Sequence, residues 1–355
     1  MKKIVTALLA ASLIITCTAS AGLAAQGKTT AKKTSTKTVA KKTVAKKTAA
    51  KTAAKPAQKT KQLPQAQRKI SPGHTETADT LLVTAEWLKN NLNNVILIDC
   101  RFASLYQASH IPGAVSAPWT YFVNTTAPNG SEEYGTILPA EQLAKKIGAL
   151  GINGNRQVVC YSDTGDWGQG AWTVAVLRIA GITNAKMLDG GIYVWKNAKY
   201  PLTNKPSKNK AVPFAIQQSV KDEYVILTDG VQELMGKPTT VIADVRTLPE
   251  YEGKIAPFKE KRKGHLPGAI HLPMDNFIDI ASGRFKTADE IKAELEAKGI
   301  TKDTDLVLYD TCGVRAGFAA MACRMAGFGK AKFYDNGFQA WAGNDMMPIE
   351  VTEQQ

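Results

Sequence analysis

The residues best suited to chemistry occur in one short stretch of this 355-residue chain. They are Asp310, Thr311, Cys312, Gly313, Val314, Arg315 and Ala316. The apolar run before this stretch predicts a buried strand, and the apolar spacing from Ala316 to Met325 predicts a helix. Cys312 is therefore expected on a strand-to-helix loop, beside backbone N–H groups and a helix dipole that favour an anion. Such a position lowers the pKa of a thiol, and Arg315 adds a positive charge.

The stretch thus predicts a nucleophilic thiolate in an anion-binding loop. The alternative is a buried and inert core cysteine, because free cysteine is among the most buried residue types. The loop position favours the nucleophile, since a core cysteine has no need of it.

The segments around Cys312 alternate between short apolar strands and helices. A strand ends at Asp244, a turn contains His265, and a helix over residues 288–298 is stopped by Gly299. The strand before the loop, the helix after it and a further strand near Phe333 complete a parallel α/β pattern. Open α/β sheets bind ligands beyond the carboxyl ends of their strands, which is where Cys312 lies.

A second set of motifs, in the first half of the chain, matches this set in the same order. The matching pairs are 95–101 with 241–246, 109–114 with 264–269, 158–165 with 306–313, and 187–195 with 333–341. Their offsets are nearly constant, at 145 (244 − 99), 155 (265 − 110), 148 (309 − 161) and 146 (341 − 195) residues. The larger offset at the histidine motif indicates a charged insertion over residues 252–263. The chain therefore contains a duplicated domain, with copies expected at residues 76–204 and 205–355.

This ordered set of motifs resembles the rhodanese family, and specifically its tandem-domain sulfurtransferases. The residues that carry the resemblance are Asp244 and Arg246, residues 264–269, the Cys312 loop, and residues 334–341, with their counterparts in the first copy. The resemblance extends from about Thr80 to Pro348. It implies two α/β domains, each a parallel doubly wound sheet flanked by helices, with an inactive first copy and a catalytic second copy.

The activity that the resemblance implies is sulfur transfer. The cysteine takes a sulfane sulfur from a small anionic donor such as thiosulfate or mercaptopyruvate, holds it as a persulfide, and passes it to a thiol or cyanide. A thiolate and a loop of inward-facing N–H groups suit this chemistry without a metal or cofactor. We therefore expect Cys312 to be catalytic, with no metal and no cofactor. The expected substrate-binding residues are Asp310, Thr311, Gly313, Val314, Arg315, Ala316 and Arg246.

The loop departs from the family pattern, in which the order is Cys-x-x-Gly-x-Arg or Thr. Aligned on Gly313 and Arg315, Asp310 takes the place of the cysteine and Cys312 comes two residues later. Either the loop is rebuilt so that Cys312 still points into the ring of amides, or Asp310 fills that ring and ordinary persulfide chemistry is lost. A carboxylate there would repel thiosulfate unless its pKa is raised. Glu250 stands about where related enzymes have a donor-binding arginine, which weakens the expectation of the usual donors.

Two further hypotheses stay open at this point. The first is a non-catalytic rhodanese-fold module that uses the altered loop to bind an anion or a partner. The second is a thiol enzyme that acts through Cys312 on another chalcogen oxyanion, such as selenite. A cysteine phosphatase is excluded, because the spacing between Cys312 and Arg315 is too short for that class.

Several other chemically suggestive residues are interpreted as structural. Ser162 replaces the cysteine in the first copy, which is expected to be a structural half. His110 and His265 precede Pro-Gly turns, and in the family such histidines are mostly structural. The residues expected to pack in cores or to brace a sheet are Cys100, Cys160, Trp195, Trp341 and Asp244.

Residues 1–25 predict a signal peptide. Two lysines follow the initiator Met, an apolar run covers residues 4–15, and Ala19-Ser20-Ala21 offers a cleavage site. The apolar run is too short for a comfortable membrane span. Lipid anchoring through Cys17 is an alternative, although Thr16 fits a lipoprotein motif poorly. Both interpretations predict a periplasmic or secreted protein.

Residues 26–75 form a Lys/Ala/Thr-rich segment whose composition predicts a disordered basic linker. No Asp or Glu precedes Glu76, so the net charge of +14 belongs to this N-terminal part of the chain. A nucleic-acid-binding core is therefore not expected, and no specific nucleic-acid partner. The linker is either a solvated spacer or a tether to an anionic membrane or cell-wall surface. The other expected partners are the sulfur donor and a thiol acceptor.

Overall fold

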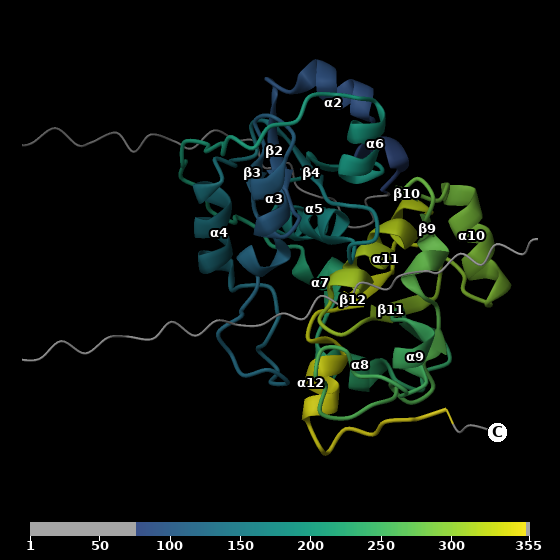
Figure 1. Ribbon diagram of the computed structural model, residues 1–355. Coiled ribbons are helices and arrows are strands. Elements are labelled where there is room, and N and C mark those ends of the chain that lie inside the picture. The colour runs from purple at the N-terminus through teal and green to yellow at the C-terminus, as the bar shows by residue number, and fades with distance from the viewer. Residues whose placement is uncertain (1–75, 353–355) are drawn as a thin grey trace, which may run out of the picture. The chain divides into compact units, whose positions relative to one another are not determined.

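The computed structural model describes residues 76–352, which form two parallel five-stranded sheets (Figure 1). The first sheet has the order β1-β5-β4-β2-β3. Its strands are β1 (Leu82–Val83), β2 (Val95–Asp99), β3 (Val115–Ser116), β4 (Gln157–Tyr161) and β5 (Ala185–Leu188). The second sheet has the equivalent order β6-β12-β11-β7-β8. Its strands are β6 (Val225–Ile226), β7 (Thr240–Asp244), β8 (Ile270–His271), β11 (Asp305–Tyr309) and β12 (Lys332–Tyr334).

Helices connect the strands in both repeats. The first repeat has α1 (Ala78–Leu81), α2 (Ala85–Asn91), α3 (Ala103–Ala108), η1 (Trp119–Tyr121), α4 (Ala140–Ala149), α5 (Gln169–Ile179) and α6 (Gly191–Asn197). The second has α7 (Lys221–Tyr224), α8 (Thr228–Leu234), α9 (Leu248–Tyr251), η2 (Met274–Phe277), α10 (Ala288–Ala297), α11 (Val314–Met325) and α12 (Gly337–Gly343). A short antiparallel pair, β9 (Ile278–Asp279) and β10 (Arg284–Phe285), follows η2. The predicted fold class is confirmed.

Some of the sequence-based expectations concern residues beyond these elements. The predicted signal peptide, Cys17 and the basic linker lie outside the described residues and stay predictions. Among the helices of residues 76–352, none combines the length and the apolar character that crossing a membrane requires.

The strand that leads to the Cys312 loop is the middle of its sheet. β11 pairs in parallel with β7 on one side and with β12 on the other. Residues 306–309 are buried, as their continuous apolar sequence predicts for a strand covered on both faces. Such a strand is anchored along its length, so it fixes the position of the residue that follows it, Asp310.

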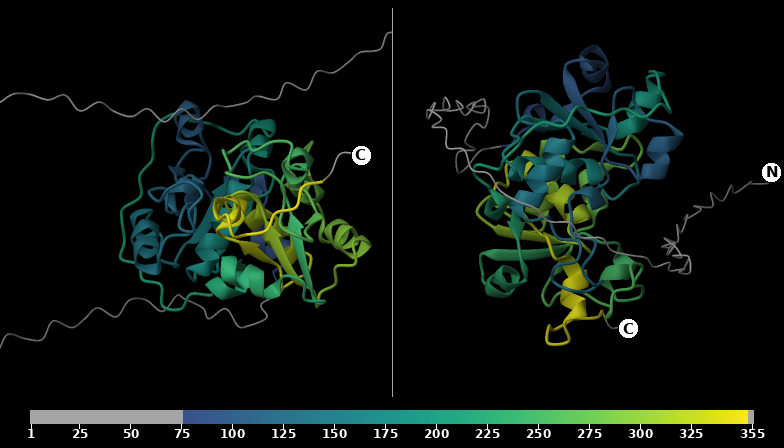
Figure 2. Two further views of the ribbon diagram at one scale, coloured as in Figure 1. Left: turned by 90° about the horizontal axis from the view of Figure 1, so that it is seen from below. Right: turned by 90° about the vertical axis from the view of Figure 1, so that its left-hand side faces the viewer.

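Helices α5 and α11 pack against one another between the two repeats, as Figures 1 and 2 show. Both helices are buried along their whole length. Two glycines allow the close approach. A Cβ on Gly168 would lie 2.5 Å from the Cβ of Phe318, and a Cβ on Gly317 would clash with the Trp172 ring. Because α11 begins at the Cys312 loop, this packing also holds the loop rigidly.

Each repeat covers the loop of the other with an equivalent segment. Gly135 of the first repeat faces Cys312, with 3.3 Å between an added Cβ and the Cys312 Cβ, and Gly283 of the second repeat faces Thr164. The two glycines are 148 positions apart (283 − 135), as are the two residues that they face (312 − 164). The loops of the two repeats are therefore closed by reciprocal contacts.

Two aspartates fasten these covering segments. The carboxylate of Asp335 accepts a hydrogen bond from the Ile137 N–H at 3.1 Å. That of Asp189 accepts one from the Phe285 N–H, also at 3.1 Å. The contact that seals each loop thus comes from the opposite repeat.

A buried carboxylate joins α5 and α11 at a second place. Glu76 accepts hydrogen bonds from the Tyr224 hydroxyl at 2.6 Å and from Nη1 of Arg178 at 3.2 Å. Its other oxygen lies 3.5 Å from Nε of Arg324. Arg178 and Arg324 occupy equivalent positions in the two repeats, 146 residues apart (324 − 178). One glutamate therefore compensates a buried arginine from each repeat.

We expect Glu76→Gln to destabilise the fold by about 3–5 kcal/mol, because it leaves two buried guanidinium groups without a carboxylate. Urea unfolding followed by circular dichroism measures this change. Asp79→Asn is the matched control, since Asp79 is an exposed acid in the adjacent helix α1. Equal stability of the two variants would contradict a linking role for Glu76.

Candidate active site

The Cys312 loop lies between β11 and α11, where the sequence predicted it. Gly313 caps the helix in the left-handed conformation, with φ of 84°. A Cβ at that position would lie 3.1 Å from the carbonyl oxygen of Asp335. Both the conformation and the close approach require glycine here, so the turn into α11 has little freedom.

Asp310 fills part of the ring of amides at the start of α11. Its side chain is buried, and Oδ1 accepts a hydrogen bond from the Ala316 N–H at 3.3 Å. Oδ2 accepts one from Nε of Arg315 at 3.4 Å. A carboxylate of the protein itself thus occupies the position that the family pattern gives to the thiol. Of the two loop arrangements predicted from the sequence, this contact matches the one in which Asp310 enters the ring.

Cys312 lies at the same N-terminal end of α11 as Asp310. The Val314 N–H acts on its sulfur and lowers the pKa of the thiol. The residue as a whole is half-buried and packs beside the hydrophobic core, whereas Cys100, Cys160 and Cys323 are buried. All four described cysteines are free thiols. The ring of amides is therefore divided between a carboxylate and a thiol.

The expected lowering of the Cys312 pKa is wrong, because its pKa is raised. Burial of the thiol is the largest cause, followed by the negative charge of Asp310. The positive charge of Arg315 and the Val314 N–H act in the opposite direction but are outweighed, and Glu260 adds a further negative charge. The thiol is consequently neutral at neutral pH.

The guanidinium group of Arg315 forms ion pairs with two carboxylates, those of Glu250 and Asp310. Its Nη1 and Nη2 each donate to one carboxylate oxygen of Glu250, both at 2.9 Å, in addition to the contact with Asp310. Nη2 also donates to the Thr311 hydroxyl at 3.0 Å. Burial raises the pKa of Glu250, but the hydrogen bonds and charge of Arg315 and the contacts with Thr247 outweigh it and lower that pKa to about 2. Arg315 is therefore a compensated cation, in contrast to the free anion-binding group that the sequence predicted.

The charged insertion over residues 252–263 folds onto the loop. Arg262 holds it by donating to the carbonyl oxygens of Trp341 at 2.9 Å and Ala342 at 3.0 Å, at the end of α12. The carboxylate of Glu260 is buried and accepts hydrogen bonds from the Thr311 hydroxyl at 3.2 Å and the Phe258 N–H at 3.0 Å. The insertion thus delivers another acid to the site.

Sequence reasoning placed this insertion but missed Glu260 and Phe258 as site residues. The ring of Phe258 lies 5.8 Å from the guanidinium carbon of Arg315. No spacing in the sequence indicates these contacts, because they depend on the attachment of Arg262 to the carbonyl end of α12. The one available signal was an acidic residue, Glu260, among the basic residues of the second half of the insertion.

Arg246 lies outside this cluster of contacts. It is buried, pairs with Asp244 at 2.5 Å, and donates to the carbonyl oxygen of Gly264 at 2.7 Å. These bonds brace the edge of the sheet, as the sequence suggested for the pair. The expectation that Arg246 binds substrate stays a prediction.

The two histidines of the Pro-Gly motifs have equivalent structural surroundings. His110 stacks on Tyr106 with ring centroids 3.8 Å apart, and His265 stacks on Tyr251 at 3.9 Å. In each, Nδ1 also contacts the carbonyl oxygen of that tyrosine, at 2.7 and 2.8 Å. The structural interpretation accounts for both residues.

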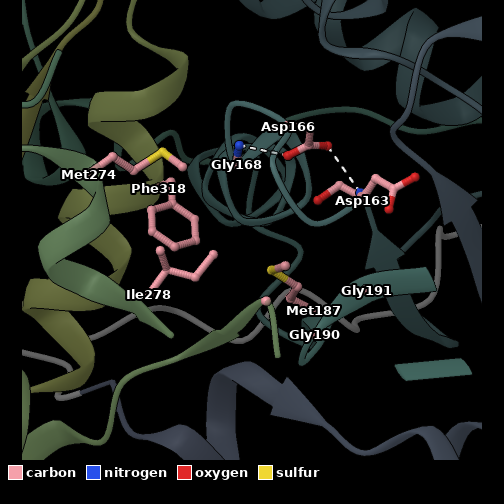
Figure 3. A pocket seen from close by; sticks show the side chains of 11 residues that line it. Asp163, Asp166, Gly168, Met187, Gly190, Gly191, Met274, Ile278 and Phe318 are labelled. Atoms are coloured by element: carbon pink, nitrogen blue, oxygen red, sulfur yellow. Dashed lines mark hydrogen bonds between the residues drawn. The ribbon is translucent and has the colours of Figure 1, made fainter. Parts of the chain in front are cut away.

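The corresponding loop of the first repeat is acidic and contains no thiol (Figure 3). Ser162 takes the cysteine position, and Asp166 accepts hydrogen bonds from the N–H groups of Asp163 and Gly168. Burial raises the pKa of Asp166 to about 6, against the effect of these N–H groups. Phe318 and other apolar side chains of the second repeat close the site, leaving a cavity of about 10 Å³, room for about one water molecule.

Comparison with known proteins gives one family for both repeats. The profile of the Rhodanese-like domain matches residues 84–198 and 227–344. The thiosulfate sulfurtransferase of Azotobacter vinelandii is 28% identical over 262 residues, which cover 72% of this chain and 91% of that protein. The sulfur carrier protein TtuD of Thermus thermophilus is 27% identical over 292 residues, covering 77% and 98% of the two chains.

Solved structures show the same fold. The anaerobic ergothioneine biosynthesis enzyme of Chlorobium limicola, crystallised with trimethyl histidine, superposes with a TM-score of 0.70. It is 20% identical, and the match covers 79% of this chain and 72% of that one. At this identity the likeness concerns the fold alone.

The raised pKa of Cys312 predicts slow alkylation that accelerates with pH. We expect the rate with iodoacetamide to rise about tenfold per pH unit from pH 7 to 9 without a plateau, because the thiolate fraction does so below the pKa. Asp310→Asn should accelerate alkylation severalfold at pH 8, since it removes a negative charge near the sulfur. Intact mass spectrometry follows the reaction, with Cys312→Ser as the control for the other thiols. A plateau near pH 7 would refute the raised pKa.

The pair formed by Glu250 and Arg315 predicts a pH-dependent contribution to stability. Because its pKa of about 2 lies below that of the unfolded chain, Glu250 stabilises the fold fully above about pH 5 and loses this effect as the pH falls through about 2. Glu250→Gln should therefore cost about 3–5 kcal/mol at pH 7 and much less near pH 2. Urea unfolding of both proteins at several pH values measures the difference. A difference that does not change with pH would contradict the pairing.

Proposed function

This chain belongs to the rhodanese-like family of sulfurtransferases, and we propose that its second repeat transfers sulfane sulfur through a persulfide on Cys312. The observation that carries the proposal is the position of this thiol. Cys312 is the least buried of the described cysteines, and it lies at the start of α11, where the Val314 N–H lowers the pKa of its thiol. A hydrogen-bond donor at a helix N-terminus stabilises the negative charge of a thiolate or a persulfide.

The transfer conserves the oxidation level of the moving sulfur. The Cys312 thiolate attacks the terminal sulfur of a donor R–S–S–H, the donor S–S bond breaks, and R–S⁻ leaves with the electron pair. The new S–S bond makes a persulfide on Cys312. An acceptor thiolate then attacks the terminal sulfur of that persulfide and releases the Cys312 thiolate, so neither step needs an oxidant or a reductant.

Asp310 has a second role in this proposal. Because the thiol is neutral at rest, the proton must leave Cys312 as the new bond forms. The carboxylate of Asp310, whose charge acts on the sulfur, is the acceptor that we assign, directly or through a water molecule. The proton then returns to the leaving thiolate R–S⁻.

A non-catalytic binding module is the second candidate. The observation in its favour is that Asp310 and Glu250 already satisfy the guanidinium and one amide that a reacting anion would use. Such a loop could bind a partner without reacting with it. The raised pKa of the thiol is compatible with this candidate as well.

Persulfide formation separates the two candidates. Incubation of the full-length chain with inorganic polysulfide at pH 8 should add one sulfur atom to the intact mass, and cyanide should remove it. Cys312→Ser should abolish the adduct, whereas Cys323→Ala, which removes a buried thiol within α11, should retain it. An adduct that persists in Cys312→Ser, or the absence of any adduct, would exclude this function for Cys312.

Replacement of Asp310 by cysteine tests whether the carboxylate in the ring of amides limits the reactivity of the loop. Asp310→Cys restores the family order of the loop and should lower the pKa of the reacting thiol, since it also removes the nearest negative charge. We expect faster sulfur loading at pH 7 than in the natural chain. Unchanged loading would show that Asp310 does not limit the reactivity of the loop.

A further inference from the structure

We propose that Glu260 sets the charge selectivity of the Cys312 site, so that the site accepts sulfur donors and acceptors carrying an ammonium group and disfavours anionic ones. This inference rests on the proposed sulfur transfer and deepens it by naming the substrate class. It reverses the expectation of an anionic donor that the sequence suggested. Three observations carry it: the balance of charge, the place of Glu260, and the aromatic side chains around it.

The charges around the loop are predominantly negative. Asp310, Glu250 and Glu260 provide three carboxylates, and Arg315 is the cation that contacts the first two. Glu250 holds that guanidinium through two hydrogen bonds, so its charge is already compensated. An anionic donor would therefore meet an excess of negative charge in a poorly solvated site, where Coulomb energies are large.

Glu260 is the carboxylate whose charge is left uncompensated. It is 7% exposed, and it accepts hydrogen bonds from two neutral donors, the Thr311 hydroxyl and the Phe258 N–H. Within residues 76–352 it forms no ion pair, unlike Asp310 and Glu250. The hydroxyl that it accepts belongs to the residue before Cys312, which places this acid at the reacting loop. A buried carboxylate without a cation is stabilised by any ligand that supplies one.

Aromatic rings from both repeats border the same segment. Phe258 packs edge-to-face on Trp167 with centroids 5.0 Å apart, and Trp167 packs on Phe102 at 5.9 Å. Phe258 and Trp167 are partly exposed, and Phe102 is exposed. Aromatic faces attract ammonium and guanidinium groups, as Phe258 already does with Arg315. Rings beside an uncompensated carboxylate favour an organic cation over an anion.

Two persulfides of equal length and opposite charge test this selectivity. Cysteamine persulfide carries an ammonium group, and 3-mercaptopropionate persulfide carries a carboxylate at the same distance from sulfur. Sulfur loading of Cys312 in the full-length chain is followed by quenched-flow intact mass spectrometry, with Cys312→Ser as the blank. We expect the ammonium donor to react at least about tenfold faster at subsaturating concentration, as one uncompensated charge contact predicts.

Glu260→Gln assigns the selectivity to one residue. It keeps the shape of the side chain and an oxygen that can accept one of its two hydrogen bonds, and it removes the charge. The ratio of the two rates should therefore fall by about tenfold, mostly through slower reaction of the ammonium donor. Glu296→Gln, on the exposed side of α10, removes the same charge elsewhere and should leave the ratio unchanged. The two variants differ in the position of the lost charge and not in its size.

The outcomes separate this inference from the function on which it rests. Equal rates for the two donors, or a faster anionic donor, would overturn the charge selectivity while leaving sulfur transfer intact. No loading by either donor would reject the proposed function itself. If Glu260→Gln does not fold, the ratio measured on the natural chain still decides whether the site prefers ammonium donors.

Discussion

The buried contact between Arg315 and its two carboxylates, Glu250 and Asp310, determines what the loop can do. An arginine at a helix N-terminus ordinarily adds to the positive potential of the helix dipole. Here the bidentate bond to Glu250 and the contact with Asp310 compensate that charge within the protein. The N–H of Ala316 likewise donates to a carboxylate of the protein, that of Asp310. These internal contacts therefore weaken the positive potential that would otherwise act on an external anion or on the thiol. The raised pKa of Cys312 follows from this weakening together with burial of the thiol.

Because the domain is duplicated, the first repeat covers the Cys312 loop of the second repeat. Each loop is closed by the opposite repeat, through Gly135 over Cys312 and Gly283 over Thr164. The first repeat thus has a definite function although its own loop contains no thiol: it excludes water from one side of the reacting loop. Exclusion of water strengthens every charge interaction there, including the unfavourable ones. A carboxylate such as Glu260 consequently has a larger influence than it would have on an open surface.

The fold could be predicted from the sequence because its signals are local and repeated. Apolar runs marked β11 and its equivalents, Gly313 marked the turn, and the nearly constant offset revealed the duplication. The place of Cys312 at the end of a strand followed from the same signals. Its pKa could not be predicted, since it depends first on burial of the thiol, which tertiary packing determines, and also on Glu260, which reaches the loop through a tertiary contact. Arg315 illustrates the limit: its position was predicted from local sequence, but the compensation of its charge was visible only after Glu250 was placed beside it.

A raised thiol pKa has two opposing effects on sulfur transfer. For each unit of increase the thiolate fraction at neutral pH falls about tenfold, while the intrinsic nucleophilicity of the thiolate rises only about threefold, given a Brønsted coefficient of about 0.4–0.5. The net loss is about threefold per unit, so a resting thiolate would be the better solution for anionic donors that bring no proton acceptor. A carboxylate beside the sulfur changes that comparison, because removal of the proton can accompany bond formation and the more nucleophilic thiolate is generated only when a donor is present. The acid that Asp310 introduces into the amide ring is therefore costly for a thiolate enzyme and useful for one that reacts from the neutral thiol, provided that its substrates tolerate the added negative charge.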